Sequence, residues 1–168
     1  DGLTINLTYH EGKLIQAATR GNGIQGEAVL PQARTIRSIP LSIPYPGLLE
    51  VQGECMMRLS VLDEYNRTHP EPLKNARNAA AGGLRQLDPA VTAERHLDVF
   101  CYQVGTIENP PYQNQEGMLS FLKANGFPVS DLMLSCKGKD KVMDCVRAVE
   151  ARRSSLDFLI DGALITDN

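Results

Sequence analysis

The N-terminal residues predict a β-hairpin, and this feature restricts the fold more than any other in the chain. Between Leu3 and Tyr9 every second residue is apolar and the residues between them are polar, which is the period of a strand with one buried face. Glu11 and Gly12 form a turn dipeptide, and residues 14–19 have the pattern of a returning strand. Two strands joined by so short a turn pair antiparallel, which disfavours a strictly parallel sheet.

The rest of the chain mixes strands and helices without a regular βαβ order. Gly126 ends one of the predicted helices, and Gly53 inside a predicted strand indicates a bulge or a close backbone approach. We therefore predict an α+β fold with mainly antiparallel sheets and flanking helices. The further strands are predicted at residues 48–54, 97–104 and 156–165, and the helices at residues 59–65, 118–125 and 142–149.

Length and composition fit one globular domain. The chain has 168 residues and a mass of 18.4 kDa, with 42% hydrophobic and 22% charged residues. No segment approaches the ~20 apolar residues that span a bilayer, so we expect no membrane association. The N-terminus lacks the pattern of a signal peptide, and we expect a cytoplasmic location.

The cysteines are widely spaced, with no CxxC pair and no nearby histidine. This spacing favours free, buried thiols over a zinc site or a disulfide framework. The cysteines are Cys55, Cys101, Cys136 and Cys145.

Three acidic residues adjoin a glycine at predicted strand ends: Asp1, Glu54 and Asp161. A glycine beside a carboxylate lets a ligand reach the acid without a clash. Carboxylates that converge on one cleft can bind ribose hydroxyls or Mg²⁺. Each of these acid–glycine pairs is also a common turn dipeptide, so a purely structural role in a turn stays open.

One segment is basic, although the net charge of −3 argues against nucleic-acid attraction by the whole chain. Residues 73–87 contain Lys74, Arg77 and Arg85 and no acidic residue. The segment is rich in alanine, which favours a helix, yet it holds two adjacent glycines that each cost about 1 kcal/mol there. The two arginines can bind phosphate, or they can lie on a solvated helix face.

Several of these segments together resemble the nucleotidyltransferase domain of NAD-dependent bacterial DNA ligases. The likeness covers nearly the whole chain, and its most specific part is the run NARNAAAGGLRQLD at residues 75–88. The other matching segments, in the same order and spacing, are residues 1–3, 18–27, 50–54 and 160–165.

The resemblance implies an ATP-grasp-like nucleotidyltransferase fold and a chemistry that seals nicks in duplex DNA during replication and repair. A lysine attacks the adenylyl phosphorus of NAD, releases nicotinamide mononucleotide and passes AMP to a DNA 5′-phosphate, from which the 3′-hydroxyl displaces it. The implied cofactors are NAD and Mg²⁺, with zinc only in other parts of the parent protein. The implied protein is a monomer in the bacterial cytoplasm, associated with the nucleoid.

The resemblance also assigns roles to individual residues. Asp1 and Gly2 match the end of the KxDG nucleophile motif. Glu54 matches a glutamate near the AMP ribose and the reacting phosphate, and Asp161 matches an aspartate that acts on phosphate and metal. Arg20 and Glu27 match residues of the loop beside the nucleotide. The arginines that match family arginines in contact with nucleotide or DNA phosphates are Arg77, Arg85 and Arg153.

The family's reacting lysine lies two positions before Asp1. We therefore expect residues 1–168 to be a partial adenylation domain that begins within the nucleophile motif and ends just after Asp161. Alone, this polypeptide is expected not to form lysyl-AMP.

Four positions differ from the family pattern and leave two functional hypotheses open. The parent protein is either a divergent, active ligase or a ligase-like protein that binds nucleotides or DNA ends without catalysis. The differing positions are Asn22 in place of Asp, Gln52 in place of Arg, Leu159 in place of Asp and Thr166 in place of Lys.

Overall fold

The computed structural model describes residues 3–20 and 26–130. The predicted helix at residues 142–149 and the predicted strand at residues 156–165 lie outside the described residues. So do several residues named above: Asp1, Gly2, Asn22, Cys136, Cys145, Arg153, Leu159, Asp161 and Thr166.

The predicted hairpin is confirmed. Strand β1 (Leu3–His10) pairs antiparallel with β2 (Lys13–Thr19). Both turn residues adopt left-handed backbone angles, with φ of 52° at Glu11 and 78° at Gly12, which matches the twist of a two-residue hairpin. A side chain at Gly12 would also put its Cβ 2.8 Å from the carbonyl oxygen of Ile43, so only glycine fits this turn.

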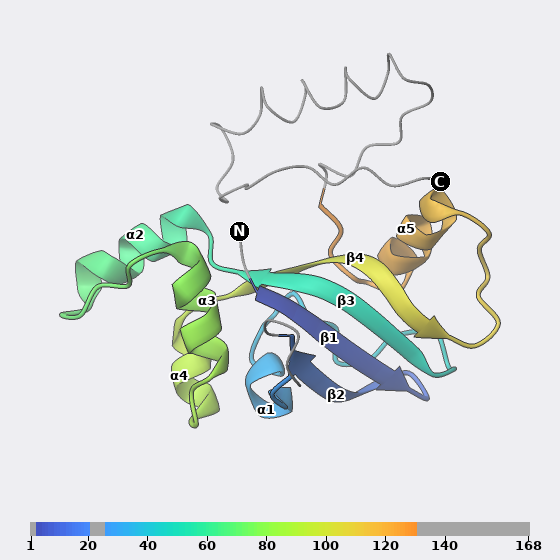
Figure 1. The fold of residues 1–168 in the computed structure, drawn as a ribbon, viewed down its shortest axis with the longest axis horizontal. Helices are drawn as coiled ribbons and strands as arrows, with labels where there is room; N and C mark the ends of the chain where they lie inside the picture. Colours follow the sequence, from blue (N-terminus) through green and yellow to red (C-terminus); the bar gives the residue numbers. More distant parts are fainter. Residues whose placement is uncertain (1–2, 21–25, 131–168) are drawn as a thin grey trace, which may run out of the picture.

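Two more antiparallel strands complete a four-stranded sheet, and the α+β prediction is confirmed. β3 (Leu49–Met56) pairs with β1, and β4 (Asp98–Ile107) pairs with β3, which gives the order β2-β1-β3-β4 (Figure 1). Gly53 lies at a register irregularity between β3 and β4. A Cβ there would be 2.8 Å from the Phe100 carbonyl oxygen, so the predicted bulge and close approach both occur.

The helices lie around the sheet. α2, α3 and α4 gather at the end of the sheet where β1 begins and β3 ends, whereas α5 contacts β4 and α1 contacts β2 (Figure 1). α2 and α5 match the helices predicted from sequence, but α1 and α4 are too short to show a helical period. The bounds are α1 (Leu30–Ala33), α2 (Leu59–Thr68), α3 (Ala76–Leu84), α4 (Pro89–Glu94) and α5 (Gln115–Ala124).

One face of the sheet forms the hydrophobic core. Ile5, Leu7 and Tyr9 of β1 are fully buried there, as their spacing predicts. The Tyr9 hydroxyl donates a hydrogen bond of 2.6 Å to the Pro40 carbonyl oxygen, so this buried polar atom is satisfied. Cys55 and Cys101 are buried free thiols, which confirms the prediction for these two cysteines.

None of the helices in the described part of the chain has the length and apolar character needed to cross a bilayer.

Candidate functional site

The second face of the sheet carries polar, partly exposed side chains at the alternate positions of β1 and β3. Thr4 lies opposite Glu54 in register, and Asn6 lies opposite Gln52. Because strand side chains alternate between faces, the buried apolar residues of these strands place all four polar residues on the opposite side. Glu54 stands near the end of β3, next to α2–α4.

Asn6 has an unsatisfied acceptor on this polar face. Its Oδ1 atom is buried, and no hydrogen-bond partner for it occurs among the described residues. A buried carboxamide oxygen without a donor is unfavourable. The polar face can therefore accept a hydrogen-bond donor from a bound molecule or an ordered water.

Arg20 and Glu27 flank residues 21–26, which contain three glycines and are called the glycine-rich loop below; residues 21–25 lie outside the described residues. The Arg20 N–H donates to the Thr4 carbonyl oxygen at 3.0 Å, and the Thr19 N–H donates to the Glu27 carbonyl oxygen at 3.0 Å. A Cβ at Gly26 would lie 1.8 Å from the Thr19 carbonyl oxygen. Only glycine permits this close approach of residue 26 to Thr19. The approach brings Arg20 and Glu27 to the end of the sheet that carries Glu54.

Helix α3 presents the basic segment. Asn75 caps its N-terminus, because its side chain accepts the Asn78 N–H at 2.8 Å, the usual role of Asn at this position. The helix packs against β3 and β1 through residues spaced by three and four positions, which form one face. These buried residues are Ala76, Ala79, Ala80, Gly83 and Leu84.

Arg77 and Arg85 are exposed on α3 and at its C-terminal cap. Eight residues of helix separate them by about 12 Å along the axis. Arg85 Nε lies 4.0 Å from Glu27 Oε2, so α3 and the base of the glycine-rich loop meet. The structure therefore brings Arg20, Glu27, Glu54 and Arg85 to one end of the sheet, and it places Arg77 on the helix that meets this end.

The arrangement includes residues that the sequence did not single out. Thr92 of α4 donates its hydroxyl to the Gly83 carbonyl oxygen at 2.7 Å, and Arg95 donates to the Ala79 carbonyl oxygen at 2.8 Å. Leu87, close to Arg85 in sequence, is 98% exposed. A threonine or arginine on a short helix gives no sequence signal for such tertiary contacts.

Comparison with known proteins identifies the family. The sequence model of the family described as the NAD-dependent DNA ligase adenylation domain matches residues 1–168. The chain belongs to this family. It is 52% identical over its whole length to a DNA ligase of Alkaliphilus metalliredigens, 54% to one of Alkaliphilus oremlandii and 46% to one of Finegoldia magna. It spans about a quarter of the length of these relatives: 26%, 25% and 25%.

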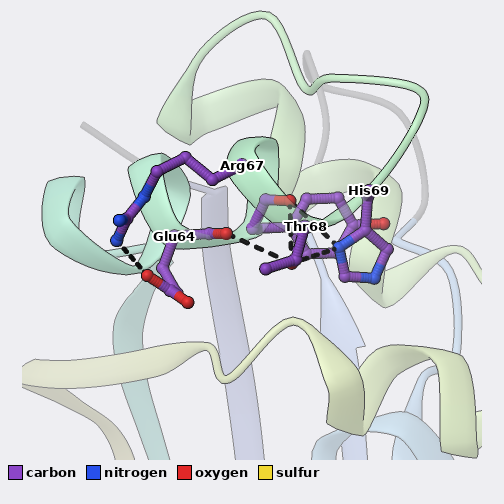
Figure 2. Close-up of polar contacts among 5 residues, drawn as sticks. Glu64, Arg67, Thr68 and His69 are labelled. Carbon is purple, nitrogen blue, oxygen red and sulfur yellow. Dashed lines mark hydrogen bonds and ion pairs between the residues drawn. The ribbon is translucent and has the colours of Figure 1, made fainter.

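A cavity of about 300 Å³ in this ligase adenylation domain lies apart from the residues matched to the family motifs. Its lining includes Tyr65 and His69 of the α2 end and Glu94 of α4. The rings of Tyr65 and His69 stack with centroids 3.7 Å apart. Figure 2 shows the end of α2, where Arg67 pairs with Glu64 and the Thr68 hydroxyl lies 3.0 Å from His69 Nδ1.

Among the described residues, the pKa is raised by burial for two thiols and a phenol of the core. Burial raises the pKa of Cys101 from 9.0 to about 12. Burial, with the negative charges of Asp98 and Glu54, raises the pKa of Cys55 above its ordinary range. The raised pKa values keep these groups neutral near pH 7, and buried neutral thiols are poor nucleophiles.

Across residues 3–20 and 26–130, no three side chains of His, Cys, Asp or Glu are placed to share a metal ion. Asp161, the residue predicted to bind metal, lies outside these ranges.

Proposed function

We propose that the complete natural protein seals nicks in duplex DNA by way of enzyme-AMP and DNA-adenylate intermediates. One observation carries this proposal: segments far apart in sequence place Arg20, Glu27, Glu54 and Arg85 at the same end of the sheet. A cluster of cations and acids beside a polar sheet face suits a ligand that carries both hydroxyls and phosphates.

In the first step, the lysine that the family places two positions before Asp1 attacks the adenylyl phosphorus of NAD. A nitrogen–phosphorus bond forms, the pyrophosphate bond breaks, and nicotinamide mononucleotide leaves with the bridging oxygen. Glu54 is proposed to bind the ribose hydroxyls, and the unsatisfied Asn6 Oδ1 supports a donor-bearing ligand on this face. Arg20 is proposed to attract the nucleotide phosphates from the loop base.

In the later steps, a DNA 5′-phosphate takes AMP from the lysine and the 3′-hydroxyl then displaces AMP. Arg77 and Arg85 are proposed to bind backbone phosphates of the nick, with Arg153 as a further contact. Guanidinium groups suit this task because they donate two parallel hydrogen bonds to a phosphate. Magnesium, with Asp161 as the proposed ligand, would neutralise phosphoryl charge when bound.

The surroundings of the reaction are proposed from the family. We place the protein as a monomer in the bacterial cytoplasm, where chromosomal DNA is its partner. The relatives named above as DNA ligases come from bacteria, which supports this placement.

The experiment is nick sealing by the complete natural protein with NAD and Mg²⁺. The proposal expects sealing, and it expects Glu54→Gln to reduce sealing strongly while Glu71→Gln, an exposed glutamate after α2, leaves it unchanged. A wild-type protein that binds nicked DNA but never seals it would support the non-catalytic hypothesis.

The non-catalytic hypothesis has one supporting observation within the described residues. Gln52, on the same face as Glu54 and opposite Asn6, supplies no positive charge where the family pattern has arginine. Under this hypothesis, Gln52→Arg together with Thr166→Lys should leave nick sealing absent. Recovery of activity would mean a weakened enzyme, and continued absence would mean a binding protein.

A further inference from the structure

Arg95 reaches from the end of α4 across the surface of α3. Its Nη1 atom donates a hydrogen bond of 2.8 Å to the Ala79 carbonyl oxygen in the middle of α3. Arg95 is the C-cap residue of α4, so one side chain links the end of one helix to the centre of another. The contact also puts a positive charge beside helix carbonyls, which is electrostatically favourable.

The paired glycines of α3 make room for this side chain. A Cβ at Gly82 would lie 3.1 Å from Arg95 Nη1. A Cβ at Gly83 would lie 3.1 Å from Leu97 Cδ1 and 3.3 Å from Arg95 Cδ. All three distances are tighter than ordinary van der Waals contact. The two glycines, which are unfavourable inside a helix, thus have a packing reason: Gly82 makes room for Arg95, and Gly83 makes room for Arg95 and Leu97.

Further contacts fix Arg95 on its other sides. Its guanidinium carbon lies 5.8 Å from the centre of the Tyr65 ring of α2, within the range of a cation–π interaction. Its Nε atom is buried without a hydrogen-bond partner among the described residues, so only Nη1 and the Tyr65 ring anchor the guanidinium. Thr92 binds the C-terminal part of α3 through the Gly83 carbonyl. The side chain therefore touches α2 and α3 while it belongs to α4.

We propose that Arg95 is a positioning residue that fixes the orientation of α3 and thereby aims Arg77 and Arg85 at the DNA phosphates. This inference rests on the proposed nick-sealing function. Arg95 holds α3 at Ala79 and Thr92 holds it at Gly83, close to Arg85, so a change in the orientation of α3 moves the Arg85 guanidinium. Arg95 itself contacts protein groups and is not assigned to the substrate.

The sharpest test is Gly82→Ala, because stability and function should change in opposite directions. The new methyl group meets only the flexible end of Arg95 among neighbouring side chains, and alanine favours the helix. We expect thermal stability to be kept or increased, while the Kd for nicked DNA rises severalfold. Unchanged nick binding in a folded Gly82→Ala protein would overturn the proposal.

A double-mutant cycle in the complete protein gives an independent test. Arg95→Met keeps the aliphatic stem and removes the guanidinium, and it should raise the Kd for nicked DNA about tenfold. In an Arg85→Ala background, Arg95→Met should raise the Kd for nicked DNA much less, because the Arg85 guanidinium that it would misplace is already absent. Equal effects in both backgrounds would contradict positioning. Arg95→Lys, which keeps the charge, should recover part of the loss and replaces Arg95→Met if the latter does not fold.

The control is Arg67→Met, which removes another arginine near this cluster. Arg67 is exposed and pairs with Glu64 on α2 (Figure 2), so nick binding should be unchanged. If the wild-type protein neither binds nor seals nicks, the proposed function fails. If it seals nicks and Arg95→Met and Gly82→Ala bind them normally, only the inference about Arg95 fails.

Discussion

Arg85 Nε lies 4.0 Å from Glu27 Oε2, across the boundary between α3 and the glycine-rich loop. The two side chains are 64% and 66% exposed, and an exposed ion pair of this kind contributes at most about 1 kcal/mol to stability. A DNA phosphate can therefore displace the Glu27 carboxylate from Arg85 at low energetic cost. The contact therefore restrains Arg85 only weakly and leaves it able to take up its proposed role.

Arg85→Ala should weaken binding of nicked DNA similarly for all sequences. Phosphate contacts position a protein on the duplex but carry no sequence information. The dependence of log Kd on log salt should become shallower by about one phosphate contact, as measured by fluorescence anisotropy at several salt concentrations. Arg67→Ala serves as the control with an unchanged slope. A loss confined to particular sequences would be incompatible with a phosphate contact.

Replacing the helix caps separates stability from function. Asn75 and Asn114 cap α3 and α5 in the same way, each accepting a backbone N–H at 2.8 Å. Either change to alanine should cost about 1 kcal/mol in urea unfolding. Only Asn75→Ala should also reduce nick binding, because only α3 carries Arg77 and leads into Arg85. Equal effects of the two variants on binding would argue against a role for α3.

Gly26→Ala should distort the base of the glycine-rich loop. The added Cβ would lie 1.8 Å from the Thr19 carbonyl oxygen, so the backbone must move, at a cost of about 1–3 kcal/mol. AMP transfer from NAD should fall as well, because Arg20 and Glu27 flank this position. Gly105→Ala is the control, since its Cβ meets only the end of the Glu50 side chain at 3.1 Å. A Gly26→Ala protein with wild-type stability would show that the close approach is absent.

High pH should destabilise the folded domain through its buried thiols. In the unfolded chain a thiol ionises near its ordinary pKa of 9.0, whereas burial raises the pKa of Cys101 to about 12 in the folded state. Below pH 9 each buried thiol therefore leaves the free energy of unfolding unchanged. Above pH 9 each one lowers the free energy of unfolding by about 1.4 kcal/mol per pH unit, until the pKa of the folded state is reached.

Urea unfolding between pH 8 and pH 11 measures this loss. Cys101→Ala should make the pH dependence shallower, even though it lowers stability at pH 8. At pH 8 an alkylating reagent should modify the peptides of Cys55 and Cys101 only after unfolding. Rapid modification of either thiol in the native protein would contradict its burial.

The local parts of the fold follow from the sequence. The hairpin was predictable because the alternation from Leu3 to Tyr9 and the Glu11–Gly12 turn act within a few residues of each other. Gly53 was predictable as a bulge, since a glycine inside a strand packs no side chain and often marks a bulge or a close backbone approach. The α2 and α5 helices have enough turns to show their period.

Contacts between distant segments do not follow from the sequence. No local pattern indicates that Glu27 meets Arg85, because this pair depends on Gly26 packing on Thr19 and on α3 crossing the same end of the sheet. The cost of placing Gly82 and Gly83 in a helix is visible in the sequence, but the neighbours that these glycines accommodate are not. In the structure Gly82 packs against Arg95, and Gly83 packs against Arg95 and Leu97.

Transfer of AMP from NAD to the protein is best measured as a change in the intact mass of the complete natural protein. The protein is incubated with NAD and Mg²⁺ and compared with an untreated sample. We expect a mass increase equal to one AMP, with the modified lysine two positions before Asp1 in the fragment spectrum and a smaller adenylated fraction in Glu54→Gln. A folded protein that carries this lysine and gains no mass under these conditions would contradict the proposed ligase chemistry.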